Sequence, residues 1–192
     1  METHIKAIIQ SSVDLKSRVI NDSRLIATIQ SVVEKIVLTY ENGGKVLFCG
    51  NGGSAADAQH LAAELSGRFY FDRLPLNAEA LHVNTSYLTA VANDYGFDNV
   101  YSRMVQAVGQ PGDILVALST SGNSINILKA IKEANSIGMT TVGFTGQTGG
   151  EMKDKCTFLI NIPSIDTPRI QEVHIMVGHI ICEMVENRLF KQ

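Results

Sequence analysis

The sequence predicts an α/β fold: a three-layer sandwich in which a five-stranded parallel sheet is flanked by helices, with two helices before the sheet and a long helix after it. From residue 45 onward, short apolar runs of strand length alternate with segments of helical spacing. This alternation is typical of a parallel sheet with helices on both faces. Two of the apolar runs end in turns rich in Gly or Ser, so candidate ligand-binding groups lie at the carboxyl ends of strands.

The elements follow one another in a regular order. Two leading helices are expected over 8–20 and 25–40, and the turn 42–44, with its two glycines, ends the second. The predicted elements after them are a strand over 45–49, a helix over 55–66, a strand over 78–83, helices across 85–108, a strand over 113–118, a helix over 123–136, strands over 140–144 and 157–162, and a final helix over 168–189.

The terminal helices carry more apolar surface than the predicted sheet accounts for. The second helix has apolar residues at helical spacing from Leu25 to Val37 and precedes every strand, and the last helix is apolar round most of its circumference, Ile181 included. We therefore expect a homo-oligomer, a tetramer, in which the helices of 1–42 and the final helix pack between subunits.

The composition describes one globular domain over residues 1–192. A formal net charge of −3 and only 6% aromatic residues argue against a nucleic-acid partner. The opening residues lack a signal-peptide pattern and no apolar run approaches the roughly 18 residues of a membrane span, so we expect a cytoplasmic protein with no membrane partner. Cys49, Cys156 and Cys182 each lie inside an apolar run, which favours reduced core thiols over disulfides or a thiolate zinc cluster.

The first candidate binding element is the glycine turn 49–54, which joins the strand 45–49 to a helix. Glycines let the backbone approach a ligand closely, and the unpaired N–H groups of a helix N-terminus favour an anion such as phosphate. The alternative is a tight turn that needs glycine for steric reasons alone.

The second candidate is the turn 119–124, which follows the strand 113–118 and holds four hydroxyl side chains. A helix cap requires only one such side chain. The excess of hydroxyls favours hydrogen bonds to phosphate oxygens.

Two helices carry candidate acid, base or metal-binding groups. His60 and Glu64 are four residues apart and share one helix face, whereas Gln171 and His179 are eight apart on the last helix, about 80° round the axis and about 12 Å along it. A His/Glu/Gln/His set resembles a catalytic zinc shell, although Gln is an uncommon zinc ligand. The alternative for each histidine is an ordinary hydrogen-bonded residue, and spacing alone does not choose between the two.

Four motifs stand in the order GKVLFCGNGGS (44–54), NDYGF (93–97), LSTSGNS (118–124) and RIQEVH (169–174). Together they resemble the sugar-isomerase domain family and, closely, its sedoheptulose 7-phosphate isomerases, over essentially the whole chain. The resemblance implies conversion of sedoheptulose 7-phosphate to D-glycero-D-manno-heptose 7-phosphate, the first step toward the heptose of bacterial lipopolysaccharide core and related glycans. It also implies a cytoplasmic homotetramer with one zinc ion per subunit.

The same resemblance implies site residues at the matching positions. The implied zinc ligands are His60, Glu64, Gln171 and His179. The implied substrate-binding residues are Asn51, Gly52, Gly53, Ser54, Glu64, Asn93, Asp94, Ser119, Thr120, Ser121, Ser124 and Gln171, with the phosphate on the turn 119–124. The chain departs from some members at Pro168, where they have an acidic residue, and the acid nearest to it is Asp166.

Aldose–ketose isomerisation removes a proton beside a carbonyl, stabilises an enediolate and returns a proton to the neighbouring carbon. Glu64 and His179 are the expected proton-transfer groups, although zinc ligation would restrict either of them as a base.

Two other function classes are weaker. The stretch 50–55 formally satisfies a dinucleotide-binding glycine pattern, but the next predicted strand ends His82-Val83-Asn84 without the acid that binds ribose, and no Lys-Ser/Thr follows the glycines as in a P-loop. A non-catalytic sugar-phosphate sensor, or a protein associated with the replication initiator, would share the phosphate turns. The presence of both Glu64 and His179 favours the enzyme.

Overall fold

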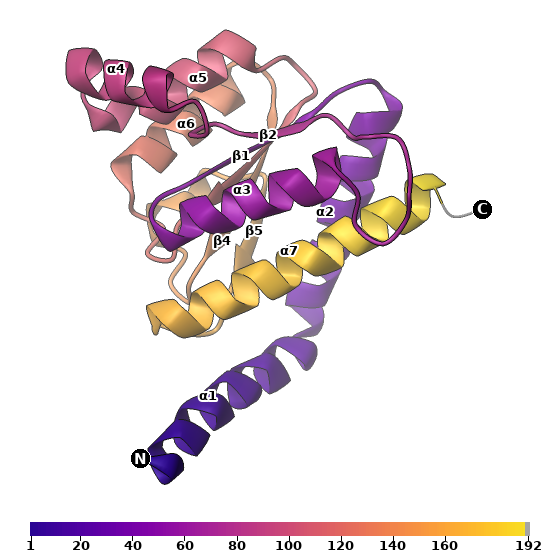
Figure 1. The fold of residues 1–192 in the computed structure, drawn as a ribbon, viewed down its shortest axis with the longest axis vertical. Helices are drawn as coiled ribbons and strands as arrows, with labels where there is room; N and C mark the ends of the chain where they lie inside the picture. The colour runs from indigo at the N-terminus through magenta and orange to yellow at the C-terminus, as the bar shows by residue number, and fades with distance from the viewer. Residues whose placement is uncertain (191–192) are drawn as a thin grey trace.

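The computed structural model describes residues 1–190 as seven α-helices, two 3₁₀ helices and five strands (Figure 1). The helices are α1 (Glu2–Ile20), α2 (Ser23–Glu41), α3 (Gly53–Ser66), α4 (Thr85–Tyr95), η1 (Phe97–Asn99), α5 (Val100–Val108), α6 (Ile125–Ser136), η2 (Gly150–Asp154) and α7 (Thr167–Phe190). The strands are β1 (Val46–Gly50), β2 (Ala78–Ala80), β3 (Ile114–Leu118), β4 (Thr140–Thr145) and β5 (Phe158–Asn161).

The five strands form one parallel sheet in the order β2-β1-β3-β4-β5, which confirms the predicted architecture. In this register Phe48 of β1 lies beside Ala80 on one side and Val116 on the other. β1 and β3 are buried along their whole length, as expected of central strands covered on both faces. Because β1 and β3 are neighbours, the turns that follow them lie at the same edge of the sheet.

Each face of the sheet has its own hydrophobic core, because side chains along a strand alternate between the two faces. Phe48, Val116 and Phe144 join the core under α2, α3 and α7. Leu47 and Leu115 join the core on the opposite face, under α4, α5 and α6. The predicted three layers, helices on both faces of the sheet, are thereby confirmed (Figure 1).

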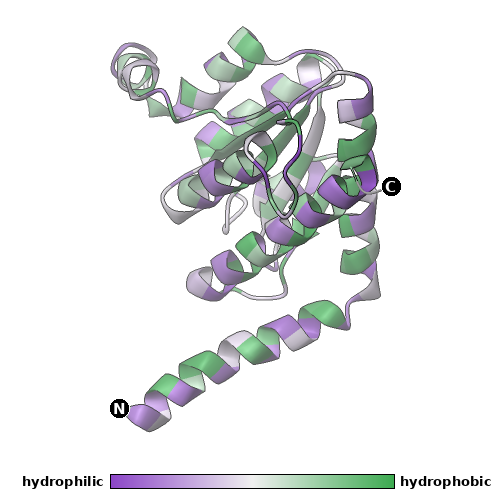
Figure 2. Cartoon of the chain, turned by 45° about the vertical axis from the view of Figure 1, so that its right-hand side comes forward, coloured by the Kyte–Doolittle hydropathy of each residue, from purple (hydrophilic) through white to green (hydrophobic). Residues whose placement is uncertain are grey.

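The prediction that the main apolar stripe of α2 is left for a subunit contact is wrong, although Ile26 and Leu38 on the outer side of this helix are exposed. Its apolar stripe from Leu25 to Val37 is buried within the protomer, because α2 lies against α7 and β5 and covers one face of the sheet. Although α2 precedes every strand in the sequence, later segments of the chain, β5 and α7, pack against it. α1 behaves differently: it projects from the body, and its apolar residues Ile5, Ile9 and Val13 are exposed (Figure 2).

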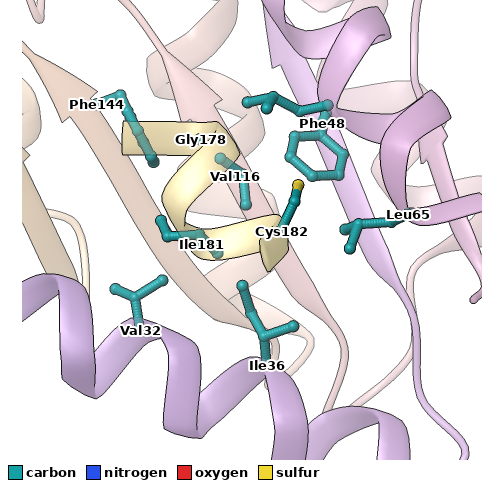
Figure 3. A pocket seen from close by; sticks show the side chains of 10 residues that line it. Val32, Ile36, Phe48, Leu65, Val116, Phe144, Gly178, Ile181 and Cys182 are labelled. Carbon is teal, nitrogen blue, oxygen red and sulfur yellow. The ribbon is translucent and has the colours of Figure 1, made fainter. Parts of the chain in front are cut away.

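α7 is buried on one side and partly open on the other. Ile181 is only 5% exposed and belongs to the core shared with α2, so the expectation that it lies in a subunit interface is wrong. The side chains in Figure 3 line a void of about 10 Å³: Val32 and Ile36 come from α2 and Ile181 from α7, and the thiol of Cys182 points toward Phe48. The next residue back along the helix, Ile180, is 38% exposed instead.

Some element boundaries differ from the sequence prediction. α1 begins at Glu2 instead of residue 8, and the edge strand β2 has three residues instead of six. The predicted helical stretch 85–108 is divided at Gly96, whose φ of +83° ends α4 before η1 and α5 continue. All three cysteines are free, as predicted. None of the helices within residues 1–190 combines the length and hydropathy of a membrane span.

Candidate active site

A hydroxyl-lined cavity of about 240 Å³ opens where β1 and β3 end. The turn after β3 supplies most of its polar groups: the Oγ atoms of Ser119 and Ser124 lie 3.0 Å apart, and those of Ser119 and Ser121 lie 3.5 Å apart. The cavity is lined by Asn51, Ser54, Leu118, Ser119, Thr120, Ser121, Ser124, Thr167 and Gln171. Seven of these residues are predicted substrate-binding residues.

Ser124 occupies the N-cap position of α6, yet its side chain makes no capping hydrogen bond. The capping explanation for this hydroxyl, which the sequence leaves open, therefore does not apply. Its Oγ contacts Ser119 and faces the cavity instead. A cluster of hydroxyls beside a helix N-terminus can donate several hydrogen bonds to a phosphate.

Asn51 is held in place by a partner that sequence reasoning missed. Its side-chain amide and that of the buried Asn126 exchange two hydrogen bonds of 2.9 Å each. One residue earlier, the carbonyl of Gly50 accepts a hydrogen bond from the hydroxyl of Tyr101. Asn126 and Tyr101 come from different helices, and their spacing from Asn51 in the sequence carries no signal of these contacts.

Two glycines of the first turn have separate roles. Gly52 takes a φ of +55°, a conformation that favours glycine, at the N-cap of α3. At Gly53 the limit is space: an added Cβ would lie 2.6 Å from Nε2 of Gln171. The absence of a side chain at Gly53 thus lets α7 bring Gln171 against the N-terminus of α3.

Further along the same two helices, His60, Glu64 and His179 form a cluster. His60 Nε2 lies 3.0 Å from Glu64 Oε1, and the rings of His60 and His179 meet edge to face with centroids 5.0 Å apart. One nitrogen or oxygen from each of the three residues lies within 4.8 Å of the others. His179 Nε2 is buried and has no hydrogen-bond partner in the structure.

This donor set fits a divalent metal ion. Two imidazoles and a carboxylate are ligands that zinc accepts, and catalytic zinc sites use three protein ligands with one position open. A buried imidazole nitrogen without a partner is costly unless something binds it, and a metal would supply the missing contact at His179. The cluster joins residues 119 positions apart in the chain and confirms that His60, Glu64 and His179 converge.

Gln171 lies near the N-terminal ends of α3 and α7, away from the cluster. It touches Gly53, which is seven residues before His60 and so about 10 Å from it along the helix axis. In this structure Gln171 lines the hydroxyl cavity. Its predicted part in metal binding stays a prediction.

Asn93 and Asp94 do not line the cavity of this protomer. They lie exposed in the last turn of α4, where the Asn93 amide donates to the Asp94 carboxylate at 2.8 Å. Their predicted role in substrate binding also stays a prediction.

Asp57 is a nearby carboxylate that the sequence analysis did not single out. It lies one turn before His60 on α3, and burial raises the pKa of its carboxyl group, although His60 opposes that shift. One of its carboxylate oxygens, Oδ2, is buried and has no hydrogen-bond partner.

Known proteins share this fold and much of this sequence. Residues 9–146 match the SIS domain family. A phosphoheptose isomerase from Clostridium acetobutylicum is 53% identical over 190 residues, which cover 99% of this chain and 97% of the relative. The chain belongs to the phosphoheptose isomerase family.

Solved structures of phosphoheptose isomerases agree over almost the whole length. The protein from Neisseria gonorrhoeae superposes with a TM-score of 0.91 at 40% identity, covering 97% of this chain and 98% of its own. The one from Francisella tularensis gives 0.92 at 36% identity, with 96% and 97% covered. The match includes both α3 and α7. These relatives therefore share the helices that carry the cavity and the His/Glu/His cluster in this member of the family.

Proposed function

We propose that this chain converts sedoheptulose 7-phosphate to D-glycero-D-manno-heptose 7-phosphate, as an aldose–ketose isomerase. The observation that carries this proposal is the placement of two sites along the same pair of helices, α3 and α7. The hydroxyl cavity lies at the N-termini of α3 and α7, and the His60/Glu64/His179 cluster lies about 10 Å further along α3. An extended seven-carbon sugar with a terminal phosphate spans a comparable length.

In this arrangement the phosphate occupies the hydroxyl cavity and directs the sugar chain toward the cluster. Ser119, Ser121 and Ser124 donate to phosphate oxygens, while Asn51 and Gln171 are placed to contact the sugar hydroxyls nearest to it. The C1 and C2 end then reaches Glu64 and His179. Placement of the far end by phosphate binding converts binding energy into orientation of the reacting carbons.

Glu64 and His179 are the proposed proton-transfer groups. One of them removes a proton from C1 of the open-chain ketose, and the other delivers a proton to C2. The hydroxyl proton of O1 passes to O2, which leaves the C1 aldehyde and the C2 hydroxyl of the aldose. Glu64 has an oxygen, Oε2, that is not engaged with His60, and His179 has an unpartnered ring nitrogen. A zinc ion bound by His60, Glu64 and His179 would polarise the carbonyl and enediolate oxygens. Because the ion would occupy the unpartnered nitrogen of His179, this residue would transfer a proton only when that nitrogen is free of the metal.

The test is turnover by Glu64→Gln and His179→Gln. We expect each variant to lose at least 100-fold in kcat, since a general acid or base contributes roughly 10²–10⁴-fold. Glu183→Gln, an exposed carboxylate one turn beyond His179, is the matched control and should keep wild-type turnover. Circular dichroism checks that each variant is folded, and metal analysis measures its zinc content. A variant that retains more than about a tenth of kcat removes that residue from the proton-transfer scheme.

We further propose that the enzyme is a cytoplasmic homotetramer. The support is the apolar surface that the protomer leaves open: Ile5, Ile8 and Ile9 on the projecting α1 are exposed. Nearby, a groove of about 390 Å³ between α1, α2 and α7 is lined by Val13, Ile20, Ile26, Met176 and Ile180 among others. A second copy is the occupant that this surface fits best, because the α1 helix of one protomer matches the apolar character of the groove of another.

A further inference from the structure

Arg73 and Glu186 form a buried ion pair outside the groups assigned to catalysis. Arg73 Nε lies 2.8 Å from Glu186 Oε1, and the two side chains are 2% and 1% exposed. Arg73 comes from the segment between α3 and β2, whereas Glu186 lies on α7, two turns beyond His179. Buried ion pairs are weak contributors to net stability, because the loss of hydration offsets much of their attraction. Net stabilisation therefore does not explain this pair well, and we ask instead which segments it holds in place.

Arg73 closes the C-terminal end of α3. Its Nη2 donates to the carbonyl of Glu64 at 2.9 Å, and its Nη1 donates to the carbonyl of Leu65 at 2.9 Å and to that of Gly67 at 3.1 Å. The last carbonyls of a helix have no partner within the helix, and a cation there also interacts favourably with the helix dipole. Arg73 thus holds the turn from which the Glu64 side chain emerges.

Glu186 holds the segment that follows α3. Its carboxylate accepts backbone N–H bonds from Phe69 at 3.0 Å, Tyr70 at 2.6 Å and Phe71 at 3.2 Å. Although burial raises the pKa of Glu186, these bonds and the one from Arg73 lower it below its usual range, so the carboxylate stays charged. The bonds pin residues 69–71 onto α7.

The pinned segment touches the catalytic cluster. The ring of Phe69 lies 5.7 Å from that of His179, centroid to centroid, and at 32° to it. Tyr70 packs edge to face on Phe69 at 4.6 Å. The ion pair is therefore connected to both proposed proton-transfer residues. Arg73 binds the backbone carbonyl of Glu64, and Glu186 holds Phe69, whose ring contacts His179.

We propose that Arg73 and Glu186 are positioning residues that set the distance between Glu64 and His179. This proposal depends on the proposed function in one respect: it takes Glu64 and His179 as the groups that act in the site. Neither Arg73 nor Glu186 is exposed to substrate. Their effect is to fix where α3 ends relative to α7, so that the three donor side chains converge.

The test compares Glu186→Gln with Asp113→Asn in the full-length protein. Asp113 is a matched buried carboxylate: it pairs with Lys45 Nζ at 2.6 Å and accepts backbone N–H bonds from Lys45 and Gln110 at 2.9 Å each. It lies just before β3, and its side-chain bonds go to Lys45 and Gln110, so none of them reaches α3, α7 or residues 69–71. Both variants remove one buried charge, so both should lower Tm.

Only Glu186→Gln should lower metal affinity and turnover. We expect its affinity for Co²⁺, followed by the visible absorption of the bound ion, to fall by about 10- to 100-fold, the loss typical of residues that orient metal ligands. Its kcat should fall with little change in KM, whereas Asp113→Asn should keep wild-type values of both. A Glu186→Gln protein with a lowered Tm but unchanged Co²⁺ affinity and kcat would overturn the positioning role.

Phe69→Leu provides a second route if Glu186→Gln does not fold. It leaves the ion pair intact and removes only the ring that touches His179. The same direction of change in Co²⁺ affinity is expected, and wild-type affinity would count against the role. The cobalt titration does not depend on turnover, so a wild type that binds Co²⁺ but does not act on sedoheptulose 7-phosphate would refute the proposed function and leave the positioning test valid.

Discussion

Gly178→Ala tests whether the close approach of α3 and α7 assembles the active site. A Cβ at this position would lie 2.5 Å from both Cδ atoms of Leu61, where carbon atoms normally stay about 3.5–4.0 Å apart. The adjoining void, which Gly178 and Leu61 help to line, is only about 10 Å³ (Figure 3). One helix or the Leu61 side chain must therefore move by about 1 Å, the difference between these distances.

The displacement falls directly on the cluster, because Leu61 follows His60 and Gly178 precedes His179. Overpacking of this kind costs about 1–3 kcal/mol, and the better helix propensity of Ala returns up to about 1 kcal/mol of it. We expect the free energy of unfolding to fall by about 0–3 kcal/mol, the range that those two terms leave. Activity should suffer more, since a 1 Å misplacement can cost about 10²-fold in rate.

The assay measures kcat and urea unfolding for three proteins. Gly178→Ala should lose about 10²-fold in kcat, and adding Leu61→Ala, which removes the clashing carbons, should restore much of it. Gly143→Ala is the control: its Cβ would lie 2.8 Å from Cys156 Sγ, in the core on the other face of the sheet, so it should change stability but not kcat. Wild-type kcat in Gly178→Ala, or no recovery in the double variant, would refute the reasoning.

Three further predictions concern binding, assembly and pH. Ser121→Ala combined with Ser124→Ala should weaken binding of both sedoheptulose 7-phosphate and inorganic phosphate more than tenfold in calorimetry, since a hydrogen bond to a charged group contributes about 1.5–3 kcal/mol; unchanged affinity for both ligands would place the phosphate elsewhere. Ile180→Glu should dissociate the assembly in sedimentation velocity while the protomer stays folded, whereas Ile181→Glu, at a buried position, should unfold it; an intact tetramer in Ile180→Glu would exclude this face from the interface. Burial lowers the pKa of His174 to about 4 from an unfolded value of 6.5, so its contribution to stability is complete above pH 6.5 and is lost as pH falls toward 4. His174→Gln should flatten the dependence of the unfolding free energy on pH in that window, by up to about 3 kcal/mol in total, and an unchanged slope would contradict this assignment.

The sequence by itself determined the layers and the binding turns. Strand-length apolar runs alternating with helical segments are local signals, and they predict five parallel strands with helices on both faces. The turn 119–124 carries its hydroxyls in one short stretch, and His60 and Glu64 share a face because they are four residues apart. Each of these features depends on neighbours in the chain, so periodicity and composition suffice to predict them.

Only the tertiary structure decided which faces meet. Asn126 pairs with Asn51, Gln171 lies on Gly53, and the main apolar stripe of α2 covers one face of the sheet. Periodicity shows that a helix has an apolar face, but it does not show what covers that face, because the answer depends on the packing of segments far apart in the chain. The convergence of His179 on Glu64 has the same origin, because it requires α3 and α7 to pack side by side. Gly178, which lies against Leu61, allows this close packing, and no local sequence pattern predicts it.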